Sequence, residues 1–200
     1  NCTSLEKISL PSSITLIKNE TFIRCKSLKQ ITIPSSVVSI GDYTFRYCSS
    51  LTEIKIPTSV ISIGPLAFSN CSSLAQISIP SSVTSIGNLI FDDCSSLTQI
   101  YIPSSITKME DSLLDQRSSL VEFSVPSSVT SIGSYSFYNF SSLKKISIPD
   151  SVTSIGSNSF SCCSKLERIT IPSSVKEIGS SAVTKIGENA FYKCSLLNQI

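Results

Sequence analysis

The amino-acid sequence predicts a repeat solenoid, made mainly of short parallel β-strands with turns and with little helix. Eight prolines follow one another at a spacing of 23 residues: Pro11, Pro34, Pro57, Pro80, Pro103, Pro126, Pro149 and Pro172. The segment before each proline alternates apolar and polar residues, as a half-buried strand does. A second alternating segment, rich in β-branched residues, follows each proline and predicts another short strand. One period along the whole chain indicates a structural unit stacked on copies of itself.

The average unit reads Leu-x-x-Ile-x-Ile-Pro-Ser-Ser-Val-Thr-Ser-Ile-Gly-x-x-x-Phe-x-x-Cys-Ser-Ser. A period of this length led by Leu-x-x-Ile-x-Ile is typical of a leucine-rich-repeat solenoid. The units span residues 5–27, 28–50, 51–73, 74–96, 97–119, 120–142, 143–165 and 166–196. We therefore predict that residues 1–200 form a single leucine-rich-repeat solenoid fragment of about eight repeats.

Two units depart from this pattern. In the irregular unit 97–119, Glu110, Leu114 and Arg117 replace the glycine, the phenylalanine and the cysteine. Unit 166–196 carries an eight-residue insertion near residues 175–190, where Val175–Ala182 is echoed by Val183–Ala190. We expect this insertion to form a bulge on the outer side of the solenoid.

Each column of the repeat has an expected role. Leu74, Ile77 and Ile79 should face the core while Gln76 and Ser78 face outward. Proline should end the strand, because it lacks an N–H, and the stacked strands should form one parallel sheet with about 4.8 Å between neighbours. We expect the glycine to occupy a turn that needs a positive φ, and the phenylalanines to fill the back of the core on a short turn or single helical turn. The second serine after each proline should hydrogen-bond nearby backbone groups.

Composition excludes several classes of partner. The formal net charge is +2 and 15% of the residues are charged, which is too little to indicate nucleic acid or an anionic membrane as a partner. No apolar run approaches the roughly 18 residues of a transmembrane helix, so we expect no membrane insertion by this fragment. The chain begins and ends inside repeats, and we expect any targeting or anchoring segment to lie outside it. The oligomeric state has no signature in the sequence.

The eight cysteines invite a disulfide interpretation, but their spacing argues against it. Seven share one repeat position and Cys162 alone stands outside it: Cys2, Cys25, Cys48, Cys71, Cys94, Cys163 and Cys194. One cysteine in each unit produces a ladder of equivalent neighbours rather than isolated pairs. We predict buried free thiols that pack as small apolar groups, with Cys162 as the accessible one.

Little in the sequence supports catalysis. Histidine is absent, which removes the usual general base and the Ser–His and Cys–His pairs, and no Cys-x-x-Cys or phosphate-binding loop occurs. Glu110, Asp111 and Asp115 could bind a cation or act as paired carboxylates, although a solvated irregular loop explains them better. We predict no enzyme activity, no cofactor and no metal site.

The outward strand positions are the predicted binding surface, because stacked solenoid units form extended binding faces. The candidate ligand-binding residues in these two columns are Lys7, Glu53, Lys55, Gln99, Tyr101, Glu122, Lys145 and Arg168. Tyr101 stands out, since an exposed aromatic residue is a common interface anchor. The alternative is that both columns are merely the polar faces of strands.

Four sequons for N-glycosylation begin at Asn1, Asn19, Asn70 and Asn139. Because serine and threonine are so abundant, a similar number is expected by chance. These four residues are therefore only possible glycosylation sites.

The combination of Ile-Pro-Ser-Ser-Val with Ile-Gly-x-x-x-Phe-x-x-Cys closely resembles the repeats of BspA-like surface antigens, over essentially the whole chain. The resemblance implies a non-enzymatic cell-surface or secreted protein that adheres to host cells and extracellular matrix, with proteins or glycans as partners. Unit 97–119 and the insertion depart from the family pattern, and no family motif assigns a ligand to particular residues. The alternative function is an intracellular leucine-rich-repeat scaffold for partner proteins.

Overall fold

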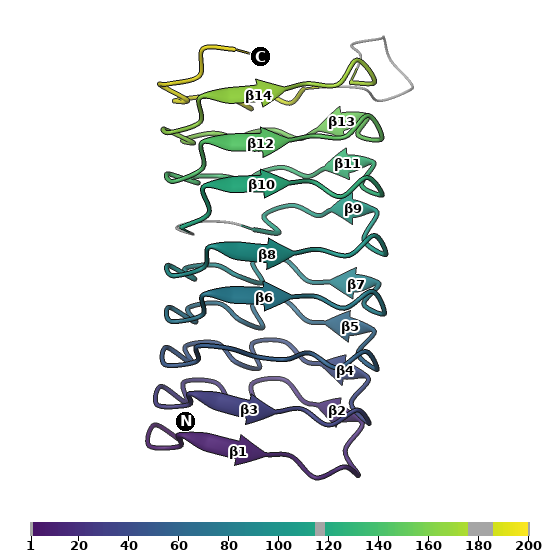
Figure 1. Ribbon diagram of the computed structural model, residues 1–200, viewed down its shortest axis with the longest axis vertical. Coiled ribbons are helices and arrows are strands. Elements are labelled where there is room, and N and C mark those ends of the chain that lie inside the picture. The colour runs from purple at the N-terminus through teal and green to yellow at the C-terminus, as the bar shows by residue number, and fades with distance from the viewer. Residues whose placement is uncertain (1, 115–118, 176–185, 200) are drawn as a thin grey trace. The chain divides into compact units, whose positions relative to one another are not determined.

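The computed structural model describes residues 2–114, 119–175 and 186–199 and divides into two compact units, residues 1–105 and 106–200. Each unit is a stack of coils, one coil for each sequence repeat (Figure 1). The described residues contain no helix, and therefore none that could cross a bilayer. The predicted fold class, a solenoid of short parallel strands, is confirmed. That the 200 residues form one continuous solenoid stays a prediction.

The first unit contains two families of strands. The first strand of each coil appears as β1 (Lys7–Ser9), β3 (Gln30–Thr32), β6 (Gln76–Ser78) and β8 (Gln99–Tyr101). The second strands are β2 (Leu16–Ile17), β4 (Ser39–Ile40), β5 (Ser62–Ile63) and β7 (Ser85–Ile86). β1 pairs with β3 and β6 with β8, whereas the second strands form one sheet in the order β2-β4-β5-β7. All of these pairs are parallel and join residues 23 positions apart.

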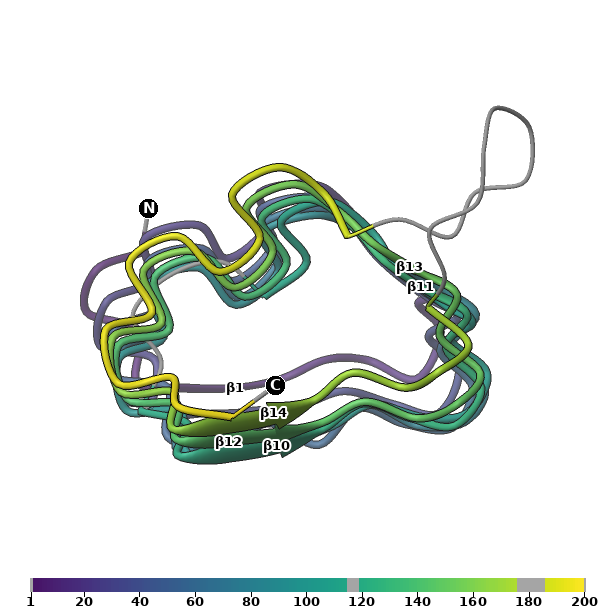
Figure 2. The same cartoon turned by 90° about the horizontal axis from the view of Figure 1, so that it is seen from above.

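The second unit repeats this arrangement. Its first strands are β10 (Glu122–Ser124), β12 (Lys145–Ser147) and β14 (Arg168–Thr170), and its second strands are β9 (Lys108–Met109), β11 (Ser131–Ile132) and β13 (Ser154–Ile155). The two parallel sheets run in the orders β10-β12-β14 and β13-β11-β9. Viewed along the stack, β10, β12 and β14 lie over one another along one side of the coil (Figure 2).

The expectation of one uninterrupted first-strand sheet is wrong at the coil of residues 51–73. Its sequence, Leu-Thr-Glu-Ile-Lys-Ile-Pro, has the same alternation as its neighbours, yet no strand forms there. A single parallel bridge between Thr32 and Lys55 is the pairing found at this position. The first-strand ladder of the first unit is therefore interrupted between β3 and β6.

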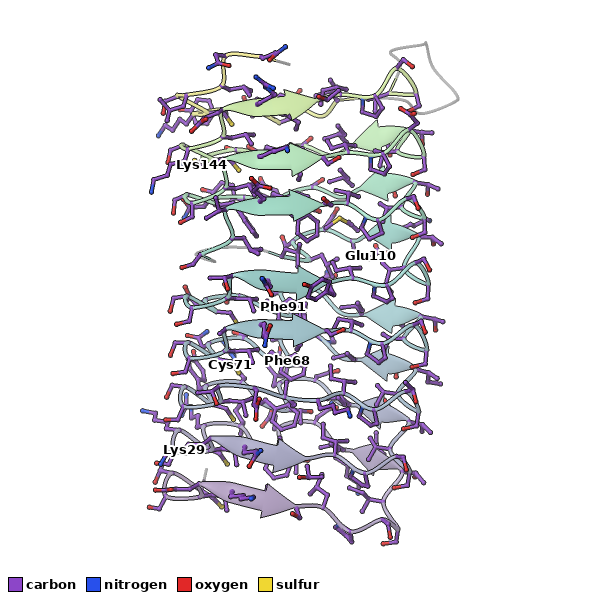
Figure 3. All side chains as sticks on the ribbon, in the orientation of Figure 1. Lys29, Phe68, Cys71, Phe91, Glu110 and Lys144 are labelled. Carbon is purple, nitrogen blue, oxygen red and sulfur yellow. The ribbon has the colours of Figure 1, made fainter. Side chains whose placement is uncertain are left out.

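The core is filled by columns of identical residues, as the alternation predicts. Ile31, Ile77 and Ile146 are buried in the middle of their strands, and the residues on either side of each are exposed. The phenylalanines lie on turns at the back of the coil, without a helical turn, and stack on one another. Successive rings in the first unit are 5.4, 5.5 and 5.9 Å apart between centroids. Such offset stacks add to the free energy of burial, and Phe68 and Phe91 show the arrangement in Figure 3.

A third ladder on the turn side of each coil was not predicted. Two residues of each turn have a positive φ although none is glycine, for example Tyr43 at 56° and Tyr47 at 63°; in unit 97–119 the one among the described residues is Ser112. The N–H of Tyr43 donates to the carbonyl of Pro65 at 2.9 Å, and that of Tyr47 donates to the carbonyl of Ser69 at 2.9 Å. These bonds to the next coil stabilise a conformation that is otherwise unfavourable for a residue with a side chain.

The expected role of the glycine column is therefore wrong: no described glycine has a positive φ. Glycine is required instead because the coils approach closely at this point. A Cβ added to Gly41 would lie 2.6 Å from the backbone nitrogen of Asn19, and one added to Gly133 would lie 2.6 Å from that of Asp111. The glycine N–H uses this proximity, since that of Gly41 donates to the Ile17 carbonyl at 2.8 Å.

The serine column is structural, as predicted, but its acceptors belong to the preceding coil. The Oγ of Ser59 donates to the Val37 carbonyl at 2.6 Å, and Ser82, Ser105, Ser128, Ser151 and Ser174 make the equivalent bond at 2.5 to 2.8 Å. Ser36 differs, because its buried Oγ has no protein partner.

The two irregular repeats have different outcomes. Most of the insertion lies outside the described residues, so its predicted bulge is not described. Ile155 nevertheless forms a parallel bridge with Ile186, and the Gly187 N–H donates to the Ile155 carbonyl at 2.7 Å, so the second Ile-Gly copy occupies the column. In unit 97–119, Leu114 takes the phenylalanine position and is buried.

Replacing Gly41 with alanine should destabilise the protein by about 1–3 kcal/mol, because the added methyl group overlaps backbone that cannot move independently. Urea unfolding monitored by circular dichroism measures this change. Where no neighbouring backbone lies close to the glycine, Gly→Ala commonly stabilises a protein by about 0.4–1 kcal/mol, because it lowers the conformational entropy of the unfolded chain. The exposed Ser85→Ala is the control and should change stability by less than about 0.5 kcal/mol; an equal effect of both substitutions would contradict the packing role.

Candidate functional site

The eight candidate ligand-binding residues are all exposed. Six lie on first strands, Lys55 lies at the bridge position, and Glu53 lies two residues before that bridge. Five belong to the first unit and three to the second: Lys7, Glu53, Lys55, Gln99 and Tyr101, then Glu122, Lys145 and Arg168. Because side chains alternate between the two faces of a strand, the isoleucine between each pair of these positions packs inward. The structure therefore places the residues as expected, while their role in binding stays a prediction.

A groove of about 890 Å³ opens on this face of the first unit. Its polar lining includes Glu53, Lys55 and Tyr101, which are candidate residues, together with Gln30, Thr32, Gln76 and Ser78. Ile31, Ile33, Ile54, Ile56 and Ile77 form its apolar lining. The groove is centred on the coil whose first strand is missing, and the core isoleucines contribute to its walls there.

Lys55, Ser78 and Tyr101 occupy one column on three successive coils. Ser78 is the register partner of Tyr101, and Lys55 lies one repeat before Ser78 at the interrupted position of the ladder. Tyr101 is 60% exposed, so its ring is free to contact a ligand. A cation and an aromatic ring on either side of a small residue form a notch with both polar and apolar recognition groups.

In the neighbouring column, which contains Gln30 and Glu53, side chains of adjacent coils hydrogen-bond to each other. Gln30 Nε2 donates to Glu53 Oε1 at 3.4 Å, which orients the carboxylate toward the preceding coil. Lys7 and Gln99 do not line the groove. Gln30, Thr32, Gln76 and Ser78 were not among the candidates, because their residue types are ordinary for polar strand faces; only their positions beside the interrupted ladder distinguish them.

The second unit has a separate row of charges. Glu122 pairs in register with Lys145, and Lys145 with Arg168. Successive strands thus present one acidic and two basic side chains on the same exposed face. The groove of the first unit is the stronger candidate site, because its residues line a cavity.

The sequons differ in their surroundings. Asn1 lies outside the described residues. Asn19 is exposed, but its Oδ1 accepts a hydrogen bond from the Asp42 N–H at 2.9 Å. Asn70 and Asn139 are half-buried and have left-handed backbone, with φ of 61° and 60°. Their modification stays a prediction.

The cysteines are free, as predicted, and most of the column is buried. The thiol of Cys48 donates to the Phe22 carbonyl at 3.2 Å, and Cys71, Cys94, Cys163 and Cys194 make the same bond to the phenylalanine carbonyl of their preceding coil. Burial raises the pKa of Cys48 and of Cys94 to about 12, and raises that of Cys71 and Cys163 as well. A raised pKa keeps these thiols protonated, and the thiolate is the reactive form. We therefore interpret the buried thiols as structural groups. Cys162, predicted to be accessible, is half-buried, whereas Cys2 is exposed.

The acidic cluster does not form a recognisable site in the described residues. Asp111 Oδ1 accepts a hydrogen bond from the Ser134 N–H at 2.7 Å and so links two coils, while Asp115 lies outside the described residues. Within the part of the chain that is described, no group of three or more Cys, Asp or Glu side chains could hold a metal ion.

The buried thiols predict a loss of stability in alkaline solution. The unfolded thiols ionise near pH 9 while the folded Cys48 and Cys94 stay protonated to about pH 12. The stabilisation is complete below pH 9 and is lost as the pH rises toward 12, by about 1.4 kcal/mol per pH unit for each thiol.

Urea unfolding between pH 8 and 10 measures this slope. The double variant Cys48→Ala/Cys94→Ala should have a shallower slope than the parent chain, whatever its stability at pH 8. Cys2→Ala, which removes an exposed thiol, should leave the slope unchanged. Identical slopes for all three proteins would show that these thiols ionise in the folded state.

Comparison with known proteins places this architecture in a family. The model of the BspA type leucine rich repeat region matches six copies, over residues 1–121, 111–185 and 180–200. A search of the curated proteins found no match.

Several solved structures are similar. The leucine-rich repeat protein TpLRR of T. pallidum is 26% identical, with a TM-score of 0.61 over 96% of this chain and 78% of that one. A leucine-rich repeat protein from Eubacterium ventriosum has a TM-score of 0.76 at 23% identity, over 98% and 60% of the two chains. The pneumococcal vaccine antigen PcpA has a TM-score of 0.60 at 24% identity, over 84% and 51%. With its repeats matched along the sequence, this chain belongs to the BspA-type leucine-rich repeat family.

Proposed function

We propose that this chain is a non-enzymatic, cell-surface or secreted binding protein that attaches to proteins or glycans of host cells or extracellular matrix. The contact surface is the first-strand face of the first unit, centred on the groove. The observation that supports this most is the column of Lys55, Ser78 and Tyr101, in which an exposed aromatic ring and a cation flank a small residue above a partly apolar groove.

The composition of this face suits protein binding. Tyrosine is enriched among residues that dominate binding energy, and its ring loses little conformational entropy when it is immobilised. The isoleucines along the groove supply apolar area, and Gln30, Gln76 and Glu53 supply hydrogen-bonding groups. A mixed surface of this kind can exclude water around one anchor while the polar rim fixes the orientation of the partner.

Family membership supports the same function class. BspA-like repeats imply surface adhesion, and one structural relative, PcpA, is described as a vaccine antigen. Leucine-rich repeat solenoids are typically non-catalytic scaffolds, and the absence of histidine from the sequence agrees with a binding role. An intracellular scaffold would use the same surface for a different partner.

Antibody labelling of cells that produce this chain tests its location. Labelling of intact cells is expected if the protein is displayed outside. Labelling that appears only after the cells are permeabilised would contradict a surface role and favour the intracellular scaffold.

Binding of the purified 200-residue chain to a panel of immobilised matrix proteins tests the surface. Tyr101→Ala should weaken binding on the order of tenfold or more, since loss of an anchor costs about 2 kcal/mol, and Lys55→Ala should weaken it less. Both side chains are exposed, so the unfolding midpoint should stay within error of the parent. Tyr135→Ala, which removes a 43%-exposed tyrosine from the second unit, is the matched control. Equal binding by all variants would remove the groove from the proposal.

A further inference from the structure

Two arginines and two tyrosines gather on the turn side of the first unit, away from the first-strand face. Arg24 comes from the coil of residues 5–27, and Tyr43, Arg46 and Tyr47 come from the coil of residues 28–50. We call these four residues the Arg–Tyr cluster. Arg24 is exposed and the other three are half-buried.

The side chains of the cluster hold one another in place. The guanidinium of Arg46 lies 5.5 Å from the centre of the Tyr43 ring and 4.9 Å from that of Tyr47. Arg46 Nη2 also donates to the Tyr47 hydroxyl at 3.4 Å. The guanidinium of Arg24 lies 5.6 Å from the same Tyr47 ring. Two cations thus share one aromatic ring, and cation–π contacts keep their planar groups positioned before any ligand arrives.

The positive charge of the cluster is not neutralised by the protein. Among the described residues, neither guanidinium has a carboxylate oxygen within 4.0 Å; the ion pair found there is Lys29 with Glu6. The nearest acidic positions in sequence are Glu20 and Asp42, and Asp42 Oδ2 accepts a hydrogen bond from Asn19 at 3.3 Å. Arg46 Nε is buried and donates to no protein acceptor. An anionic ligand would therefore contact the Nη groups of the two arginines, because the Nε of Arg46 is enclosed.

The surroundings distinguish between classes of anionic ligand. An added peptide strand would need free backbone groups, but the N–H groups of Arg24 and Tyr47 already donate to the carbonyls of Arg46 and Ser69, at 2.7 and 2.9 Å. On the next coil, Asn70 Nδ2 donates to Ser69 Oγ at 2.9 Å, and Ser69 Oγ donates to Asp92 Oδ2 at 3.4 Å, so an amide and a hydroxyl group lie between the cluster and this carboxylate. The guanidinium groups can bind sulfate, and the neighbouring amide and hydroxyl groups can hydrogen-bond to the hydroxyl groups of a sugar chain.

We propose that the Arg–Tyr cluster binds the sulfate groups of a sulfated polysaccharide. Each guanidinium presents parallel N–H groups that fit two oxygens of one sulfate. The two arginines come from adjacent coils and so engage two anionic groups along a polysaccharide chain that crosses the turns. This site is separate from the groove and does not depend on the proposed function of that groove.

Binding of the 200-residue chain to immobilised heparin, measured by surface plasmon resonance at low and physiological salt, tests the proposal. The double variant Arg24→Gln/Arg46→Gln should lose on the order of tenfold or more in affinity, because each removes a charge-assisted hydrogen bond. Arg46→Lys, which keeps the charge but removes the planar fork, should lose part of the affinity. Thermal unfolding by circular dichroism confirms that each variant is folded.

The matched control removes two exposed positive charges elsewhere. Lys108→Gln/Lys144→Gln should bind heparin within about twofold of the parent chain. An equal loss in this control would show attraction by overall charge and overturn the assignment. Equal affinity of the parent for poly-glutamate and for heparin would overturn it too, because an acidic peptide would then satisfy the site as well. Tyr101→Ala should leave heparin binding unchanged, which separates this site from the groove.

Discussion

The close stacking of successive coils is the constraint on which the rest of the structure depends. Each coil is too thin to bury its own apolar residues or to satisfy its own backbone, so both tasks fall to its neighbours. Hydrogen bonds link each coil to an adjacent one. They are made by the backbone of the two strand ladders and the turn ladder, and by the serine and cysteine side chains. Gly41 and its equivalents permit this approach at the tightest point. A residue inside the coil is therefore determined by its counterpart 23 positions away, which explains why the repeat is so uniform.

Side chains that differ between repeats, and that could bind a ligand, are consequently confined to the exposed positions of each coil. On the first-strand face, one column contains serine or threonine in every repeat except two, where Lys55 and Tyr101 replace them. On the turn side, the two left-handed positions tolerate almost any side chain because their backbone, rather than the side chain, makes the contact with the next coil. Three residues of the Arg–Tyr cluster, Arg24, Tyr43 and Tyr47, occupy such positions. A single architecture thus provides two surfaces with different chemistry, one with a partly apolar groove and one with two arginines beside tyrosine rings.

The regular features could be predicted from the sequence, because period and alternation translate directly into stacked strands with isoleucine inside. The burial of the cysteines followed from the same register. The glycine role could not, since a glycine in a turn motif suggests a positive φ, and only the inter-coil distance shows that the space for a Cβ is missing. The interruption at residues 51–73 has no sequence signal, because Glu53, Ile54 and Lys55 alternate like their neighbours. Likewise, Arg24 and Arg46 occupy different repeat positions, and their proximity emerges only from the geometry of the turns.

The bridge from Ile155 to Ile186 has an implication for how such proteins change. These partners are 31 residues apart, yet the ladder resumes with Gly187 in its usual place. Near-identical repeats in a coding sequence invite slippage during replication, and an eight-residue duplication inside a packed element would displace every residue that follows it. Here the extra residues need only return the chain to the next column, because no distant part of a core depends on their length. A lineage carrying such an array can therefore acquire length variants at little risk, and each variant offers a new arrangement of exposed residues to selection.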